Sequence, residues 1–177
     1  MITNIGIGFV TGRKHFQNIL KAYINNWLEH GIIEDKSIRL HLFIAYDLNY
    51  QNTNVDDYKN IDPLLKAMIS SITFIENEKI NKEIEQLTET GAITLADTHL
   101  IFGDGYAKKR NMVLYFAMKH AMDKLIFLDD DEYPMAVFKN KDNFITWAGQ
   151  SIVGTHLSYN NECDITHGYH CGYISTI

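Results

Sequence analysis

The sequence is poor in cysteine, since its 177 residues include only Cys163 and Cys171. Two cysteines cannot supply a disulfide framework, so we expect a reducing compartment and a cytoplasmic protein. Both lie in the segment CDITHGYHCGY (residues 163–173), which also contains two histidines. A structural zinc site is not expected there, because paired Cys-x-x-Cys spacing is lacking and all the ligands fall in one short stretch.

Basic residues are also scarce, with 16 Lys and Arg against 22 Asp and Glu and a formal net charge of −6. A nucleic-acid-binding protein is therefore not expected, because its basic footprint is missing. No apolar run reaches the length of a membrane span, so no transmembrane segment is predicted. The apolar N-terminal residues lack a basic leader and are interrupted by Gly6 and Gly8, which favours a strand over a signal peptide.

Two common phosphate-binding signatures are missing from GIGFVTGRKH (residues 6–15). Thr11 stands where the third glycine of Gly-x-Gly-x-x-Gly belongs, and the Gly-Lys-Ser/Thr of a P-loop does not occur. The hydrophobic share of 46% and the charged share of 21% are ordinary for a globular protein. This length and composition predict one domain over residues 1–177.

Strand-like and helix-like segments alternate along the chain. Strands are predicted over residues 2–10, 38–46, 72–75 and 125–128. Helices are predicted over residues 16–28, after Asp62-Pro63, over 77–90 and over 107–121, whereas residues 48–60 read as a surface loop. This order predicts an α/β fold, a mostly parallel sheet flanked by helices on both faces.

The most informative stretch is KLIFLDDDEYP (residues 124–134), a short apolar run that ends in an acidic segment, residues 129–132. Four adjacent carboxylates repel one another, so we expect a cation nearby. Ligands of open α/β sheets bind beyond the carboxyl ends of the strands, where these acids would lie. Oxygen ligands suit Mg²⁺ or Mn²⁺, which commonly hold a phosphate-bearing substrate. The alternative is a solvated acidic turn.

GYAKKRN (residues 105–111), a predicted helix and then LIFLDDDE resemble the donor-binding half of family 2-like glycosyltransferases of the GT-A fold, which is Rossmann-like. In that family a Gly-x-x-x-x-Arg-Asn segment opens the helix before the strand that carries an Asp-x-Asp motif. The matching residues are Gly105, Arg110, Asn111, Asp129 and Asp131. The likeness covers about residues 2–135. It implies a donor-binding part over about 1–135 and a partial acceptor-side part over about 136–177.

The resemblance implies a nucleotide-diphospho-sugar donor, a divalent Mn²⁺ or Mg²⁺ ion, and transfer with inversion to an unknown acceptor, which could be a glycan, lipid-linked or a protein. Asp131 would coordinate the metal, and Asp129 would contact the ribose, the metal or metal-bound water. The base pocket would be formed by Val10, Thr11 and Asp47. Asp130 would point back toward the sheet, since successive strand residues face opposite ways.

Further roles implied by the resemblance carry open alternatives. Lys109, Arg110 and Asn111 would lie near the phosphates, although Lys109 could equally be solvated. Glu132 would touch the sugar or acceptor, or else pair with a lysine. His170, or His167, would complete the metal shell, with an ordinary polar loop as the alternative.

The catalytic base of such enzymes, usually Asp or Glu, follows the metal motif. Asp164 is the better candidate and Glu162 the other, because Asp164 lies beside a Gly-rich turn. The sequence ends in GYISTI, which resembles the start of a strand. We therefore expect a truncated or minimal catalytic domain that is weak or inactive alone.

Other functions fit parts of the pattern. A haloacid-dehalogenase-like, Mg²⁺-dependent phosphatase also uses Asp-x-Asp after an apolar strand, with the first Asp as nucleophile. That family places the motif on its first strand and follows it with Thr or Val, whereas Glu132 follows here. A nucleotidyltransferase would need a Gly-rich basic N-terminal signature, which GIGFVTGRKH does not provide. An EF-hand would need a central glycine in its loop, which the acidic segment lacks. A non-catalytic sugar-nucleotide-binding module remains an alternative of another class.

Overall fold

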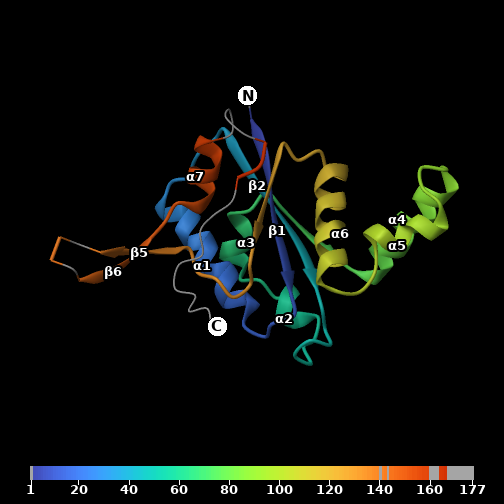
Figure 1. The fold of residues 1–177 in the computed structure, drawn as a ribbon, viewed down its shortest axis with the longest axis horizontal. Helices are drawn as coiled ribbons and strands as arrows, with labels where there is room; N and C mark the ends of the chain where they lie inside the picture. Colours follow the sequence, from blue (N-terminus) through green and yellow to red (C-terminus); the bar gives the residue numbers. More distant parts are fainter. Residues whose placement is uncertain (1, 140, 143, 160–163, 167–177) are drawn as a thin grey trace.

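A computed structural model describes residues 2–139, 141–142, 144–159 and 164–166 (Figure 1). Its centre is a sheet of four parallel strands in the order β3-β2-β1-β4. The bounds are Thr3–Thr11 for β1, Ile38–Tyr46 for β2, Ser71–Ile75 for β3 and Lys124–Leu128 for β4. The chain winds outward from β1 through β2 to β3, and then returns to place β4 on the other side of β1. The direction of winding therefore reverses between β1 and β4.

Helices cover both faces of this sheet (Figure 1). Helix α1 (Phe16–Glu29) packs its apolar side on one face, against alternate residues of β1 such as Ile7 and Phe9. Helix α6 (Tyr106–Lys119) covers the other face. There a Cβ added to Gly8 would lie only 2.6 Å from Val113 Cγ1, so glycine lets α6 approach β1 closely. The predicted α/β fold with helices on both faces is confirmed.

Four shorter or peripheral helices complete the part before α6: α2 (Asp56–Lys59), α3 (Pro63–Ala67), α4 (Asn77–Glu89) and α5 (Leu95–Ile101). The predicted Asp62-Pro63 start is confirmed, since Asp62 Oδ1 accepts a hydrogen bond of 2.8 Å from Leu64 N. The prediction of a surface loop over residues 48–60 is wrong in part. That segment contains α2, and Tyr58 is fully buried and stacks on Tyr46 with ring centroids 4.7 Å apart.

After β4 the chain forms an antiparallel hairpin of β5 (Met135–Lys139) and β6 (Ile145–Gly149), followed by α7 (Ile152–Ser158). Figure 1 shows the hairpin projecting to one side of the body, whereas α7 returns beside α1. Val153 of α7 is fully buried in the core on the α1 face. In the part of the chain that the structure describes, none of the helices is both long and apolar enough to cross a membrane.

Candidate functional site

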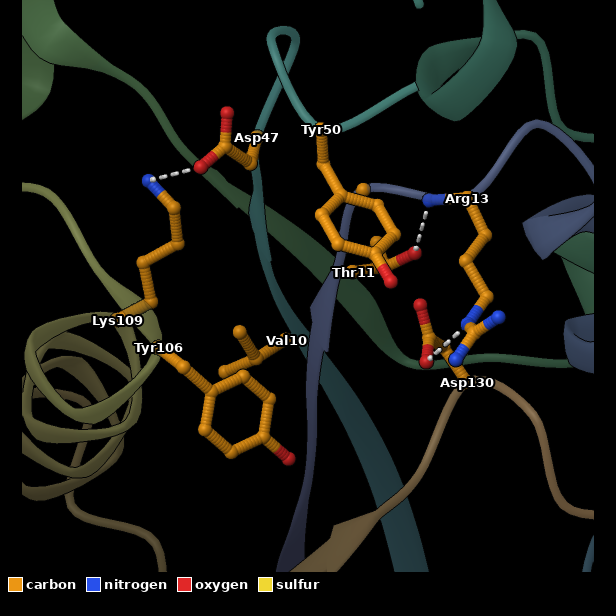
Figure 2. Close-up of a pocket in the computed structure, with 9 residues that line it drawn as sticks. Val10, Thr11, Arg13, Asp47, Tyr50, Tyr106, Lys109 and Asp130 are labelled. Atoms are coloured by element: carbon orange, nitrogen blue, oxygen red, sulfur yellow. Dashed lines mark hydrogen bonds and ion pairs between the residues drawn. The ribbon is translucent and has the colours of Figure 1, made fainter.

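A pocket of about 230 Å³ lies at the carboxyl ends of β1 and β2 (Figure 2). We call it the β1–β2 pocket. It lies beside the point where the winding of the sheet reverses, which is the usual ligand-binding crevice of open α/β sheets. Its lining residues come from β1 and the loop after it, the loop after β2, the first turn of α6 and the acidic segment: Val10, Thr11, Gly12, Arg13, Asp47, Tyr50, Tyr106, Lys109 and Asp130.

The structure brings together the three residues predicted for a base pocket. Val10 and Thr11 end β1, and Asp47 follows β2, whose last residue is paired with Thr11. The backbone N–H of Asp47 donates a 2.8 Å hydrogen bond to Thr11 O, which fixes the exit of β2 beside that of β1. Asp47 Oδ1 accepts a 2.9 Å hydrogen bond from Asn49 N, so its carboxylate is held in a defined orientation.

Lys109 contributes a buried cation to the same pocket. It is only 7% exposed, so the alternative that it is solvated is wrong. Its Nζ lies 3.8 Å from Asp47 Oδ2 and 3.8 Å from Asp104 Oδ1, and each distance exceeds a hydrogen bond. The first turn of α6 enters the pocket through Tyr106 and Lys109. A helix start and a buried ammonium together favour an anionic group here.

Two tyrosines flank the pocket from separate segments (Figure 2). Tyr50 comes from the loop after β2, and Tyr106 is the first residue of α6. A Cβ on Gly12 would lie 2.5 Å from Tyr50 Cβ, so glycine at this position lets the Tyr50 side chain lie against the β1 loop. Exposed aromatic rings beside a pocket can stack on a planar ring of a ligand.

The acidic segment is paired with arginines. Asp129 Oδ1 accepts hydrogen bonds from Arg110 Nη2 at 3.1 Å and from Tyr106 OH at 3.0 Å. Arg13 donates from Nε to Asp130 Oδ1 at 3.1 Å and from Nη2 to Asp131 Oδ2 at 2.6 Å. The expectation that a cation lies near these carboxylates is therefore met by the protein's own side chains.

The expected orientation of Asp130 is wrong. It lines the β1–β2 pocket rather than pointing back toward the sheet, and its side chain is 14% exposed. Strand β4 ends at Leu128, so the alternation of a strand no longer applies to the residues that follow.

Arg110, Asp129 and Asp131 are not among the lining residues of the β1–β2 pocket, although their neighbours Lys109 and Asp130 are. Three further predicted residues are not among them either. Asn111 Nδ2 donates a 2.8 Å hydrogen bond to Leu100 O, which ties α6 to α5. Glu132 is half-buried, and Asp164 is exposed. His170, like His167 and Glu162, lies outside the described residues.

A divalent ion is implied by the resemblance, so we compared the residues present with its needs. Among the described residues, no group of three His, Cys, Asp or Glu side chains is placed to hold a metal ion. Mg²⁺ and Mn²⁺ commonly use only one or two carboxylates when substrate phosphates supply further oxygens. Asp129 and Asp131 are ligands of that kind, and so the residues fit an ion bound together with a phosphate group.

Residue-based reasoning missed Arg13, Tyr50 and Tyr106 as pocket residues. Each follows a feature that could have identified it, because Arg13 and Tyr50 come shortly after strand ends and Tyr106 follows Gly105 at a helix start. Side chains at such exits converge on one edge of a parallel sheet.

Comparison with protein-family models, with curated proteins and with solved structures found no match to this chain. The comparisons therefore add nothing to the resemblance of the motifs described above.

Proposed function

We propose that the chain is a GT-A-type glycosyltransferase that binds a nucleotide-diphospho-sugar in the β1–β2 pocket. The observation that carries this proposal is the position and lining of the pocket. It lies where the sheet winding reverses and combines the Asp47 carboxylate, two tyrosine rings and the buried Lys109.

Each part of a nucleotide has a matching group in this pocket. The Asp47 carboxylate can accept hydrogen bonds from N–H groups of a nucleotide base, and the ring of Tyr50 or Tyr106 can stack on that base. Lys109 and the start of α6 offer positive potential for the diphosphate. The acidic segment then lies on the β4 side, beyond the phosphates.

The reaction joins an acceptor hydroxyl oxygen to the anomeric carbon while the bond from that carbon to the diphosphate oxygen breaks. A carboxylate takes the hydroxyl proton, and the electron pair leaves with the diphosphate. Asp164 is the candidate base within the described residues. An Mn²⁺ or Mg²⁺ ion held by Asp129 and Asp131 would neutralise the leaving diphosphate, with His170 as a further candidate ligand. Lys109 adds positive charge from the side of the pocket opposite Asp130 (Figure 2).

Binding of nucleotides tests the proposal directly. We expect one nucleoside diphosphate among UDP, GDP, ADP and CDP to raise the melting temperature of the chain, and more so with Mn²⁺, because a ligand that prefers the folded state stabilises it. In calorimetry Asp131→Ala should abolish the gain from Mn²⁺, whereas the exposed Asp142→Ala should keep it. Equal Mn²⁺ dependence in both variants would refute the metal assignment. Failure of all four nucleotides to bind would refute the function.

Two observations favour a non-catalytic sugar-nucleotide-binding module as the second candidate. Arg13 bridges Asp130 and Asp131, and the candidate base Asp164 is exposed and does not line the pocket. Nucleotide-sugar binding without transfer or hydrolysis would select this alternative.

A further inference from the structure

A second pocket, also of about 230 Å³, lies between α1 and the base of the β5–β6 hairpin. We call it the α1–hairpin pocket. Its lining residues are Ala22, Asn26, Glu29, Tyr133, Pro134, Met135 and Gly149. Within the described residues it shares none of its lining with the β1–β2 pocket.

Asn26 is a buried amide beside this pocket. The residue is only 4% exposed, and its Oδ1 is buried without a hydrogen-bond partner among the described residues. It lies on the buried side of α1, among apolar residues such as Tyr23 and Trp27. A buried amide oxygen left unpaired costs about 1–3 kcal/mol, whereas the Nδ2 group of the same amide lies beside the pocket and can donate to a ligand.

The polar atoms of the pocket converge on the space left by Gly149. A Cβ at that position would lie 3.6 Å from Asn26 Nδ2, 3.8 Å from Glu29 Oε2 and 3.9 Å from His30 Nε2, in ordinary van der Waals contact. The missing side chain therefore leaves room beside an amide and a carboxylate. A hydroxyl group in this space can donate to the Glu29 carboxylate and accept from Asn26 Nδ2.

The rest of the lining indicates the class of ligand. Tyr133 is 55% exposed and offers an aromatic ring, and Pro134 and Met135 add apolar surface. Among the described lining residues Lys and Arg do not occur and Glu29 is negative, so this lining disfavours an anionic ligand. Hydroxyl groups on a ring with an apolar face satisfy both parts of this lining.

The pocket lies near the acidic segment. Tyr133 directly follows Glu132 in the sequence, and Tyr23 lies about one helical turn before Asn26 on α1. Burial and then the negative charges of the acidic segment raise the pKa of the Tyr23 hydroxyl, which places that segment near this part of α1.

We propose that the α1–hairpin pocket binds a neutral saccharide ring through Asn26 and Glu29 and is the site of the sugar acceptor. The binding of a saccharide stands on the pocket itself. Only its assignment to the acceptor rests on the proposed function.

The test uses the full chain labelled with ¹⁵N and the methyl glycosides of glucose, galactose, mannose and N-acetylglucosamine. At least one glycoside should shift the amide resonances of Ala22, Asn26 and Gly149. Asn26→Leu should weaken that binding about tenfold, the loss of a hydrogen bond, and should raise the melting temperature because the unpaired amide is gone. Gly149→Ala should also weaken it, since the added methyl group fits but occupies the space.

Asn25→Leu is the matched control, because Asn25 is the exposed neighbour on the same helix. This variant should bind the glycoside as the unchanged chain does. Absence of shifts at the pocket with every glycoside, or undiminished binding by Asn26→Leu, would overturn the proposal. Binding of glucosamine alone would overturn it too, because Glu29 would then be holding an ammonium group.

The same spectra separate this inference from the proposed function, because nucleotides are followed at the amide of Lys109. If nucleotides bind there and glycosides do not bind at Asn26, the inference fails by itself. If glycosides bind at Asn26 and nucleotides do not bind at Lys109, the saccharide pocket stands, while the acceptor assignment and the proposed function fail.

Discussion

Replacement of Lys109 by methionine tests the electrostatic design of the β1–β2 pocket. Methionine keeps most of the length of the buried side chain and removes the ammonium group. Lys109 is 7% exposed, and its Nζ lies 3.8 Å from each of two carboxylates. We expect Lys109→Met to weaken the binding of a nucleoside diphosphate and to leave the binding of the corresponding nucleoside unchanged, because only the diphosphate needs the positive charge.

The size of the effect follows from the environment of the ammonium group. Two unit charges about 4 Å apart interact by about 4 kcal/mol at the effective dielectric of a protein surface. Part of this is lost to desolvation and to the competing attraction of Asp47, so a hydrogen bond to a charged group contributes about 1.5–3 kcal/mol. The dissociation constant should therefore rise by about 10- to 100-fold.

Calorimetry with UDP and uridine, or with the pair of another base that binds, measures both effects. Lys108→Met is the matched control, because it removes the same charge from the neighbouring position of α6 and does not alter the lining of the pocket. The reasoning is refuted if Lys109→Met weakens nucleoside and diphosphate equally, or if Lys108→Met has the larger effect.

Two predictions concern the helices that hold the site. Glu83→Gln should lower the free energy of unfolding by about 1–2 kcal/mol in urea titrations, because Lys119 Nζ donates to both Glu83 oxygens at 2.6 Å, whereas the exposed Glu85→Gln should change it little. Burial alone would raise the pKa of Glu83, but its hydrogen bonds and the Lys119 charge lower it overall, so this stabilisation is present above the ordinary pKa of a glutamate and is lost as the pH falls through the lowered value. Gly8→Ala should lower the unfolding free energy by about 1–3 kcal/mol, because its methyl group would lie 2.6 Å from Val113 Cγ1. An unchanged melting temperature would contradict the close packing of α6 on β1.

The main α/β framework could be predicted from the sequence because its signals are strong and local. The predicted strands over 2–10, 38–46, 72–75 and 125–128 match β1 to β4 to within about one residue at each end. Their apolar runs reflect burial on both faces of a parallel sheet. The hairpin β5–β6 and the short helices α2, α5 and α7 were missed, because such short segments carry too few residues for a periodic pattern.

The candidate site could be predicted only in part. Val10, Thr11 and Asp47 were predicted from the family resemblance, and the structure brings them together because the carboxyl ends of neighbouring parallel strands meet at one edge of the sheet. The pairing of Arg13 with Asp130 joins residues 117 positions apart, and no local pattern encodes such a contact. The role proposed for Asn26 could not be predicted either. Asn26 lines a pocket only together with residues of the β5–β6 hairpin, which lies more than 100 residues later in the sequence.

The ion pairs with Arg13 and Arg110 weaken the inference that the acidic segment by itself requires a metal ion. Its carboxylates are already partly neutralised in the protein without a bound ion, since Arg13 bridges two of them and Arg110 holds Asp129. Repulsion within the segment alone is thus an insufficient reason for a metal ion. A diphosphate bound in the β1–β2 pocket, as proposed, would add negative charge beside these carboxylates and beside Asp47, where Lys109 is the main remaining cation among the described lining residues.

If the proposed function holds, a divalent ion would balance that added charge, and the need for the metal would arise with the donor. Binding of Mn²⁺ and of the nucleoside diphosphate should then be coupled, each tightening the other by the same factor. Arg13 opposes the binding of the ion, because an ion bound to Asp131 would compete with the 2.6 Å hydrogen bond from Arg13 Nη2. Metal affinity measured without nucleotide should consequently be weak, and the affinity of the pair should far exceed what either ligand shows alone.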